Sequence, residues 1–333
     1  MVLLQYPWLR RCVTIPAYFF ITGLMLATLP LWLPLSWLVG WVYSGARSAS
    51  RCLLFIQTYL LCESVGIIAS FLIWLLYIGR HSSSAYFNLN YRLQHWWANT
   101  LKRGAEVLFS LSFHVEGEDA LAGPGAIMLA RHTSIGDTVV PVVFYAMPMN
   151  KRLRYVLKKE LLFDPCLDIV GNRLPNCFID RFSDEVSAEL SLLQTVVSDM
   201  SDRDSVLIYP EGTRFSEKKR ARVLKVLERQ GSSVLPLAEQ WTQLLPPRPS
   251  GTLALLEVNP GRDVLMCAHA GFEGSASFQS LFNGQWVGKA IGIRFWRVPH
   301  AELPKDQEQR RQWLNQQWSL MQQAVEQLVA HYH

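Results

Sequence analysis

The sequence predicts an α/β fold: a mixed, mostly parallel sheet flanked by helices, preceded by an N-terminal helical hairpin in a membrane. Charge is unevenly placed, because residues 1–80 carry only six of the charges in a chain with 32 Lys and Arg and 27 Asp and Glu. Short apolar runs then alternate with helical patterns, and three polar clusters each follow such a run. We therefore assign residues 1–80 to the hairpin and residues 81–333 to an α/β domain with a C-terminal amphipathic helix.

Two long apolar stretches form the expected hairpin. Residues 12–46 carry no charge, and residues 52–79 carry only Glu63. About 20 apolar residues are enough to cross a bilayer, so both stretches are long enough. A cleaved signal peptide is the alternative, but a second apolar stretch follows at once without a convincing small-residue cleavage site. We expect retained membrane segments.

Prolines and flanking charges refine the hairpin. Pro16, Pro30 and Pro34 are expected to bend or break the first segment, because each lacks a backbone donor. The first segment either spans with kinks or lies partly in one leaflet. Basic residues flank both outer ends, whereas the connecting loop holds only Arg47 and Arg51. The positive-inside rule then places both ends in the cytoplasm.

The remaining elements follow in chain order. An aromatic-rich amphipathic helix is expected over 86–108, with Trp96 and Trp97 on the membrane or the domain. Helical spacing also marks 183–200, which opens with Ser-Asp-Glu, and the stretch from Leu314 to Leu328. The apolar runs predict strands at Phe113–Val115, Ala126–Ala130, Leu153–Val156, Ser205–Tyr209, Val234–Leu237, Val264–Ala268 and Val287–Phe295.

Composition excludes several classes of protein. Half of the 333 residues are hydrophobic and 18% are charged, which excludes a disordered or fibrous chain. The six cysteines show no C-x-x-C pair, so we expect neither a zinc site nor a disulfide framework, and a reduced, cytosol-facing domain. A net charge of +5 suits an anionic membrane surface or phosphorylated substrates. It is too diffuse to indicate nucleic acid.

The first polar cluster, 129–137, contains His132 and Asp137 directly after a predicted buried strand. Five residues apart, the two would face about 140° apart on a regular helix, so they meet only if a turn folds the chain back. Gly136 allows such a turn. A histidine held by a carboxylate is a general base of fixed tautomer. A structural histidine is the alternative for this motif alone.

Two further clusters carry guanidinium groups. Residues 171–181 end in Phe-Ile-Asp-Arg, and Arg181 could bind an anion or pair with Asp180 or Asp184 on the surface. Residues 206–216 contain Pro-Glu-Gly-Thr-Arg after a predicted buried strand, so Glu211, Gly212 and Arg214 would lie at the carboxyl edge of the sheet, where open α/β folds bind ligands. A polar turn closing the strand is the alternative.

The order of these motifs resembles the glycerolipid acyltransferase family, specifically the membrane-bound 1-acylglycerol-3-phosphate (lysophosphatidate) acyltransferases. The resemblance covers roughly residues 90–325. Two more stretches match: Lys158-Lys159-Glu160-Leu161, and Leu245-Pro246-Pro247-Arg248-Pro249-Ser250-Gly251, which resembles a Leu-Pro-Arg-x-x-Gly motif. The fourth family motif corresponds either to this last stretch or to Val234-Leu235-Pro236.

The resemblance implies an O-acyltransferase that moves a fatty acyl group from acyl-CoA or acyl-carrier protein to the free hydroxyl of lysophosphatidate, giving phosphatidate. His132 would be the general base and Asp137 would orient it. Substrate-binding roles would fall to Arg181, Glu211, Gly212, Thr213, Arg214 and Lys159. The acyl thioester is a co-substrate, and neither a metal nor another cofactor is implied. The partners would be a lysophospholipid acceptor, the donor and membrane lipid, with the site facing the cytoplasm and, in a bacterium, the inner membrane as location.

The motifs also bear on three alternative functions. A serine hydrolase is disfavoured, since there is no G-x-S-x-G motif. A non-enzymatic membrane adaptor would have no use for a His-Asp pair. Within the acyltransferases, a lysophospholipid remodelling enzyme with a different acceptor headgroup is the alternative.

Overall fold

The computed structural model describes residues 6–179 and 186–333. The chain divides into two compact units. The first comprises Met1–Leu111, Leu157–Ser183 and Phe278–Gly288, and the second comprises Ser112–Val156, Asp184–Ser277 and Lys289–His333. Helices dominate the first unit, and a sheet forms the centre of the second.

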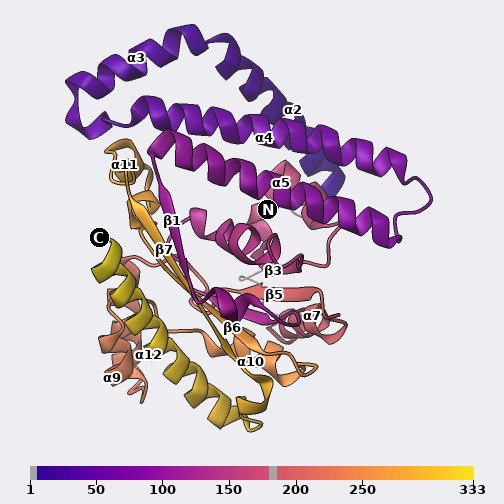
Figure 1. The fold of residues 1–333 in the computed structure, drawn as a ribbon, viewed down its shortest axis with the longest axis vertical. Coiled ribbons are helices and arrows are strands. Elements are labelled where there is room, and N and C mark those ends of the chain that lie inside the picture. The colour runs from indigo at the N-terminus through magenta and orange to yellow at the C-terminus, as the bar shows by residue number, and fades with distance from the viewer. Residues whose placement is uncertain (1–5, 180–185) are drawn as a thin grey trace. The chain divides into compact units, whose positions relative to one another are not determined.

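The first unit begins with three apolar helices, α2 (Pro7–Ala27), α3 (Leu29–Val42) and α4 (Ala49–Leu76), with α2 and α3 both packed against α4 (Figure 1). Of the three prolines expected to distort the first segment, only Pro30 marks a break. Thr28 leaves the helical conformation before it, and Pro30 lies in the first turn of α3, where its missing N–H costs nothing. Pro16 and Pro34 lie inside helices.

Two helices of this unit, Pro7–Ala27 and Ser44–Leu76, are long and apolar enough to cross a membrane. The burial of side chains along α4 is opposite to that of a helix in a soluble protein. The polar residues Gln57, Glu63 and Ser70 are buried, whereas the apolar residues Ile68 and Phe71 are more than half exposed. Large apolar side chains gathered on an exposed face indicate contact with lipid or another apolar partner. This pattern agrees with the expected hairpin.

Helix α5 (Ser84–Phe109) follows and packs along α4. Ser83 caps its start by accepting the Tyr86 N–H, and Ser110, in the left-handed region, ends it. Trp97 donates its indole N–H to Oε1 of Glu63 at 2.7 Å, so a buried carboxylate of α4 has a partner. The rest of the unit holds α6 (Pro165–Gly171), the short strand β4 (Cys177–Ile179) and α11 (Phe278–Phe282).

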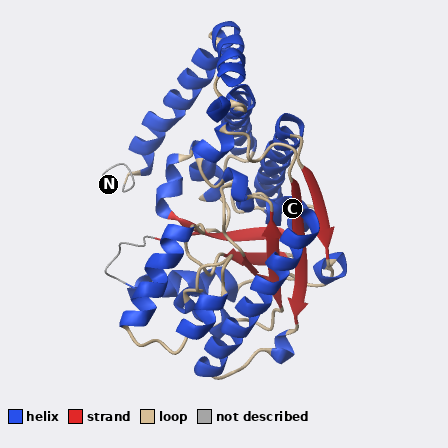
Figure 2. Cartoon of the chain, turned by 90° about the vertical axis from the view of Figure 1, so that its left-hand side faces the viewer, coloured by secondary structure: helices blue, strands red, loops and turns tan. Residues whose placement is uncertain are grey.

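The second unit contains a twisted sheet, whose strands are red in Figure 2. The strands lie in the order β1-β7-β6-β2-β5-β3. Strands β2, β3, β5 and β6 run parallel to one another, β7 is antiparallel to β6, and β1 is parallel to β7. The prediction of a mixed, mostly parallel sheet is therefore confirmed. The bounds are β1 (Ser112–Glu116), β2 (Ile127–Ala130), β3 (Arg152–Lys158), β5 (Asp204–Ile208), β6 (Val264–Ala270) and β7 (Ala290–Val298).

Helices cover this sheet and bury its central strands. Every residue of β2, β5 and β6 is buried, as expected for parallel strands covered on both faces. Helix α12 packs against β6 and β7 through its apolar stripe, which includes Leu314, Trp318 and Val325. The helices are α7 (Val186–Ser198), α8 (Glu217–Arg229), α9 (Leu235–Gln240), α10 (Pro249–Glu257) and α12 (Gln307–Tyr332).

One predicted strand is wrong. Residues Val234–Leu237 begin helix α9, with Pro236 in its first turn. A short apolar run does not by its spacing distinguish a strand from a helical turn, and a proline favours the start of a helix. Strand β4 was not predicted, because its three residues are too few to show a period. Residues 183–185 of the predicted helix 183–200 lie outside the described residues.

Candidate active site

The polar clusters around His132 and Glu211 come together because they follow neighbouring strands. Leu129 of β2 pairs with Ile208 of β5, and the two strands run in parallel, so the segments that leave them emerge at the same edge. Strand β6 pairs with β2 on the other side and ends at Ala270. This edge therefore gathers residues from three separate parts of the sequence.

His132 and Asp137 meet at this edge. Nδ1 of His132 lies 3.1 Å from Oδ2 of Asp137, and the imidazole stacks on the ring of Tyr209 with centroids 4.4 Å apart. Its side chain is 16% exposed, and Nε2 has no protein partner in the described part of the chain. The ring is thus held by one nitrogen and by one face, while its other nitrogen is open to a substrate. This geometry suits a general base.

A tight turn brings the two residues together. Asp137 lies in the 3₁₀ helix Gly136–Thr138, and its carboxylate accepts the backbone N–H groups of Thr133 and Ser134 and the Ser134 hydroxyl. The turn therefore closes on Asp137 itself. Gly136 is needed for space rather than for an unusual φ, because a Cβ there would meet the ring of Phe272 at 2.9 Å.

Electrostatics keep Asp137 ionised. Burial on its own would raise the pKa of Asp137, but the nearby His269 and His132 rings and the Ser134 N–H together hold it below its ordinary value. Oδ1 of Asp137 lies 3.8 Å from Nε2 of His269, so the carboxylate stands between two histidines. Burial lowers the pKa of His269. An ionised carboxylate in this position would stabilise a protonated His132 ring.

Glu211 joins three loops at the same edge. Its Oε1 accepts the His132 N–H at 2.7 Å, and its Oε2 accepts the Leu245 N–H at 2.9 Å. The side chain is buried, and burial raises the pKa of Glu211 to about 8, against the lowering effect of these two N–H groups. Both carboxylate oxygens of Glu211 accept main-chain N–H groups, so the geometry favours a role in ordering these loops.

The Leu245–Gly251 stretch belongs to the site. Besides the Leu245 bond to Glu211, the Arg248 N–H donates to the carbonyl of Pro210 at 2.8 Å. Helix α10 begins directly after this, at Pro249. Between the two stretches considered for the fourth motif, the geometry favours Leu245–Gly251, because Val234-Leu235-Pro236 only begins α9.

The residues after Glu211 form a cationic loop. Gly212 has a φ of +68° and donates its N–H to the Tyr209 carbonyl, so this N–H closes the turn instead of facing a ligand. Lys219 of α8 donates to the Thr213 hydroxyl at 2.9 Å and to the Arg214 carbonyl at 2.8 Å. The Arg214 guanidinium is partly exposed and has no hydrogen-bond or ion-pair partner among the described residues. It is available to an anion.

The structure thus brings His132, Asp137, Glu211, Thr213 and Arg214 to one sheet edge. Lys159 lies in the first unit, at the start of the 3₁₀ helix Lys159–Phe163, and Arg181 lies outside the described residues. Their predicted roles stay predictions. Within the described ranges, no group of three or more His, Cys, Asp or Glu side chains could hold a metal ion.

Two residues of the site were not predicted. Tyr209 supports the His132 ring, and its hydroxyl donates to the Asp137 carbonyl at 3.2 Å. His269 lies within strand β6, and Nε2 of its ring donates to the Arg131 carbonyl at 3.0 Å. Tyr209 lies at the end of a predicted strand, and His269 is a single polar residue in an apolar run. Nothing in the sequence therefore marked either residue as part of the site.

Comparison with known proteins gives a family match and a similar solved structure. Residues 112–249 match the family model described as Acyltransferase. The crystal structure of the 1-acyl-sn-glycerophosphate (LPA) acyltransferase PlsC from Thermotoga maritima superposes with a TM-score of 0.57 at 14% sequence identity, over 85% of this chain and 98% of that one. At this identity the likeness concerns the fold. None of the curated proteins compared with this chain matches it in sequence.

Proposed function

We propose that this chain, whose residues 112–249 match the Acyltransferase family model, transfers a fatty acyl group from an acyl thioester to the free hydroxyl of lysophosphatidate. The observation that carries the proposal is the free Nε2 of a His132 ring whose Nδ1 lies 3.1 Å from Asp137. The acyl donor is acyl-CoA or acyl-carrier protein, and the product is phosphatidate. A headgroup other than a bare phosphate on the acceptor is the second candidate.

The reaction follows from this geometry. Nε2 of His132 takes the hydroxyl proton as the alcohol oxygen attacks the thioester carbonyl, and the ionised Asp137 stabilises the imidazolium. A carbon–oxygen bond forms, the carbon–sulfur bond breaks, and the proton passes from the imidazolium to the departing thiolate. No acyl-enzyme is required. A positioned base contributes about 10²–10⁴-fold to such a step.

The acceptor is placed by the loop after β5. The partly exposed Arg214 guanidinium offers paired donors to a phosphate, and Lys219 adds positive charge at the same loop. Substrate-binding roles for Arg181 and Lys159 remain proposals that rest on the sequence motifs alone. The N–H groups of Thr213 and Arg214 make no hydrogen bond with the described residues, which leaves them as candidate donors to the developing oxyanion.

The helical unit supports an integral membrane location. The helices Pro7–Ala27 and Ser44–Leu76 are apolar enough to insert, and an exposed acyl chain costs about 0.8 kcal/mol per methylene, so a lysolipid is best used at the bilayer. We place the site on the cytoplasmic side, because thioester donors are cytoplasmic and the outer ends of the hairpin carry more basic residues than its loop.

The test is a transfer assay with the purified full chain. Labelled acyl-CoA and acyl-carrier protein are each offered with lysophosphatidate and with lysolipids carrying choline, ethanolamine or glycerol headgroups. We expect transfer to lysophosphatidate to lead, and His132→Ala to abolish it with unchanged membrane insertion. The control is His331→Ala, since His331 is exposed on α12. Full activity of His132→Ala refutes the general-base role, and preference for a different headgroup refutes the assigned acceptor.

A further inference from the structure

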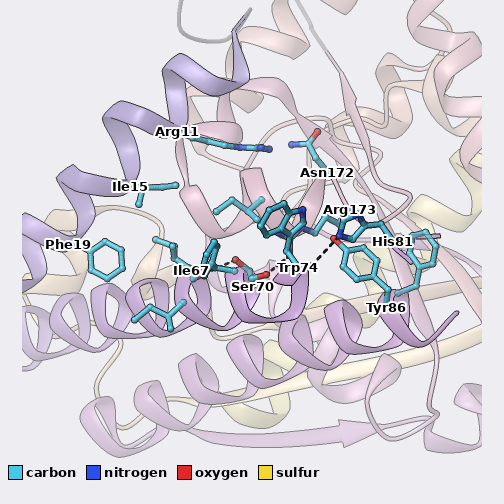
Figure 3. A pocket seen from close by; sticks show the side chains of 14 residues that line it. Arg11, Ile15, Phe19, Ile67, Ser70, Trp74, His81, Tyr86, Asn172 and Arg173 are labelled. Atoms are coloured by element: carbon cyan, nitrogen blue, oxygen red, sulfur yellow. Dashed lines mark hydrogen bonds between the residues drawn. The ribbon is translucent and has the colours of Figure 1, made fainter. Parts of the chain in front are cut away.

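The helical first unit contains a cavity of about 840 Å³, and the described residues that line it all belong to this unit (Figure 3). Its walls come from α2, from the second half of α4, from the start of α5 and from the segment that includes the end of α6. The volume lies within the 300–1,000 Å³ of typical ligand sites. No residue of this cavity is among those described at the sheet edge.

The cavity has an apolar wall and a cationic end. Ile15 and Phe19 of α2 face Ile67 and other apolar side chains of α4, whereas Arg11 and Arg173 lie at the other end (Figure 3). Among the described residues that line it there is no Asp or Glu. A charged group in apolar surroundings is costly unless it is paired, and Arg173, which has neutral partners only among the described residues, favours an anion at this end.

The protein neutralises only part of this charge. The buried Asp168 carboxylate pairs with Arg10 at 2.6 Å and with Arg11 at 3.1 Å, so two cations share one anion. Arg173 has neutral partners: it donates to the Ser70 carbonyl at 2.8 Å and to Oδ1 of Asn90 at 3.4 Å. Arg11 therefore shares its carboxylate with Arg10, and Arg173 has no carboxylate partner among the described residues.

The length of the apolar wall fits an alkyl chain. From Arg11 to Phe19, α2 rises about 12 Å, at about 1.5 Å per residue. Both α2 and α4 belong to the segments apolar enough to cross a membrane. A ligand that fits this cavity is therefore amphipathic, with an anionic head and at least one apolar tail. Membrane lipids have this chemistry.

We propose that this cavity binds an anionic membrane phospholipid, whose phosphate is held by Arg11 and Arg173 and whose acyl chain lies against α2 and α4. Arginine suits this role because its planar donors match phosphate oxygens in pairs. The bound lipid fills an apolar cavity and neutralises the cationic end, so it stabilises the helical unit.

Native mass spectrometry of the full chain in detergent tests this proposal. Dioleoylphosphatidylglycerol and dioleoylphosphatidylcholine are titrated separately. We expect one phosphatidylglycerol molecule to be retained in preference to phosphatidylcholine. Arg173→Ala and Arg11→Gln should each weaken the binding of phosphatidylglycerol about tenfold or more, which corresponds to about 1.4 kcal/mol. In the Arg11 variant, Arg10 still pairs with Asp168, which protects the fold. The control is Arg92→Ala, an exposed arginine of α5 outside the cavity.

A second variant fills the cavity without changing its charge. Ile15→Trp is expected to weaken phosphatidylglycerol binding while the melting temperature without added lipid stays near that of the parent. Equal retention of phosphatidylcholine, or unchanged binding in all three cavity variants, overturns the proposal. Binding of lysophosphatidate but not of phosphatidylglycerol overturns it too, because the cavity would then be a substrate site. His132→Ala keeps phosphatidylglycerol binding whether or not its transfer activity is lost, so the two proposals fail separately.

Discussion

Oε1 of Glu211 accepts the backbone N–H of His132 at 2.7 Å, across 79 residues of sequence. The other oxygen of the same carboxylate accepts the Leu245 N–H. Glu211 therefore fixes the main chain of the proposed base from the neighbouring strand, and Asp137 fixes its ring. Position and orientation of His132 are set by different carboxylates.

Replacing Glu211 by Gln removes one of its two acceptors. An amide has a single carbonyl oxygen, so either the His132 or the Leu245 N–H is left facing an NH₂ group. Leaving a buried donor unpaired costs about 1–3 kcal/mol. We expect Glu211→Gln to lower the free energy of unfolding by that amount and to reduce transfer activity. Chemical denaturation measures the free energy of unfolding. The control is Glu228→Gln, because Glu228 is an exposed residue of α8. Equal stability of the two variants would contradict the clamping role.

Glu211 also makes stability depend on pH. Burial raises its pKa from 4.5 to about 8, so between these values the folded protein binds a proton that the unfolded chain has lost. Its contribution to stability is thus complete below about pH 4.5 and is lost as the pH rises toward about 8. We expect the difference in unfolding free energy between the parent and Glu211→Gln to shrink or reverse over this window. Denaturation at several pH values measures it, and a constant difference would be inconsistent with the raised pKa.

Asp137→Asn tests the orienting carboxylate. Its Oδ2 accepts from Ser134 and faces Nδ1 of His132, and an amide nitrogen in that place accepts from neither. The His132 ring then loses its fixed tautomer and its stabilised imidazolium. We expect kcat to fall about 10²–10⁴-fold with little change in the KM for lysophosphatidate. Asp119→Asn, on an exposed 3₁₀ helix, serves as control. An effect on KM alone would mean that Asp137 acts in binding.

Much of this site was predictable because its chemistry is local in sequence. His132 and Asp137 are five residues apart, so a tight turn after the strand could bring them together, and the resemblance of the ordered motifs to the acyltransferases led us to expect that it does. The function of Leu245–Gly251 was harder to assign, since its bonds to Glu211 and Pro210 depend on how α9 and the following loop fold back. Tyr209 and His269 gave no signal, because their roles arise only from the pairing of β5 and β6 with β2.

The fold, like the site, has parts that the sequence predicts and parts that it does not. Strands β2, β5 and β6 were predicted because full burial on both faces selects continuous apolar runs. The strand predicted at Val234–Leu237 was wrong because four apolar residues fit one turn of helix as well as a strand. The cationic cavity was also beyond sequence reasoning, since Arg11 and Arg173 are distant in the chain and the packing of α2, α4 and α6 brings them together.

Arg214 is the side chain through which acceptor choice is best tested. Its guanidinium has no partner among the described residues, so its removal leaves no buried group unpaired and is not expected to harm the fold. A hydrogen bond to a charged group is worth about 1.5–3 kcal/mol, so Arg214→Ala should raise the KM for lysophosphatidate roughly 10- to 100-fold. The KM for the acyl donor should stay near that of the parent, and Arg214→Lys should recover part of the loss, because it keeps the charge without the paired donors. Steady-state kinetics with each substrate varied in turn measures this, with Arg222→Ala on the exposed face of α8 as control. A loss confined to the donor would show that Arg214 binds the thioester instead of the phosphate.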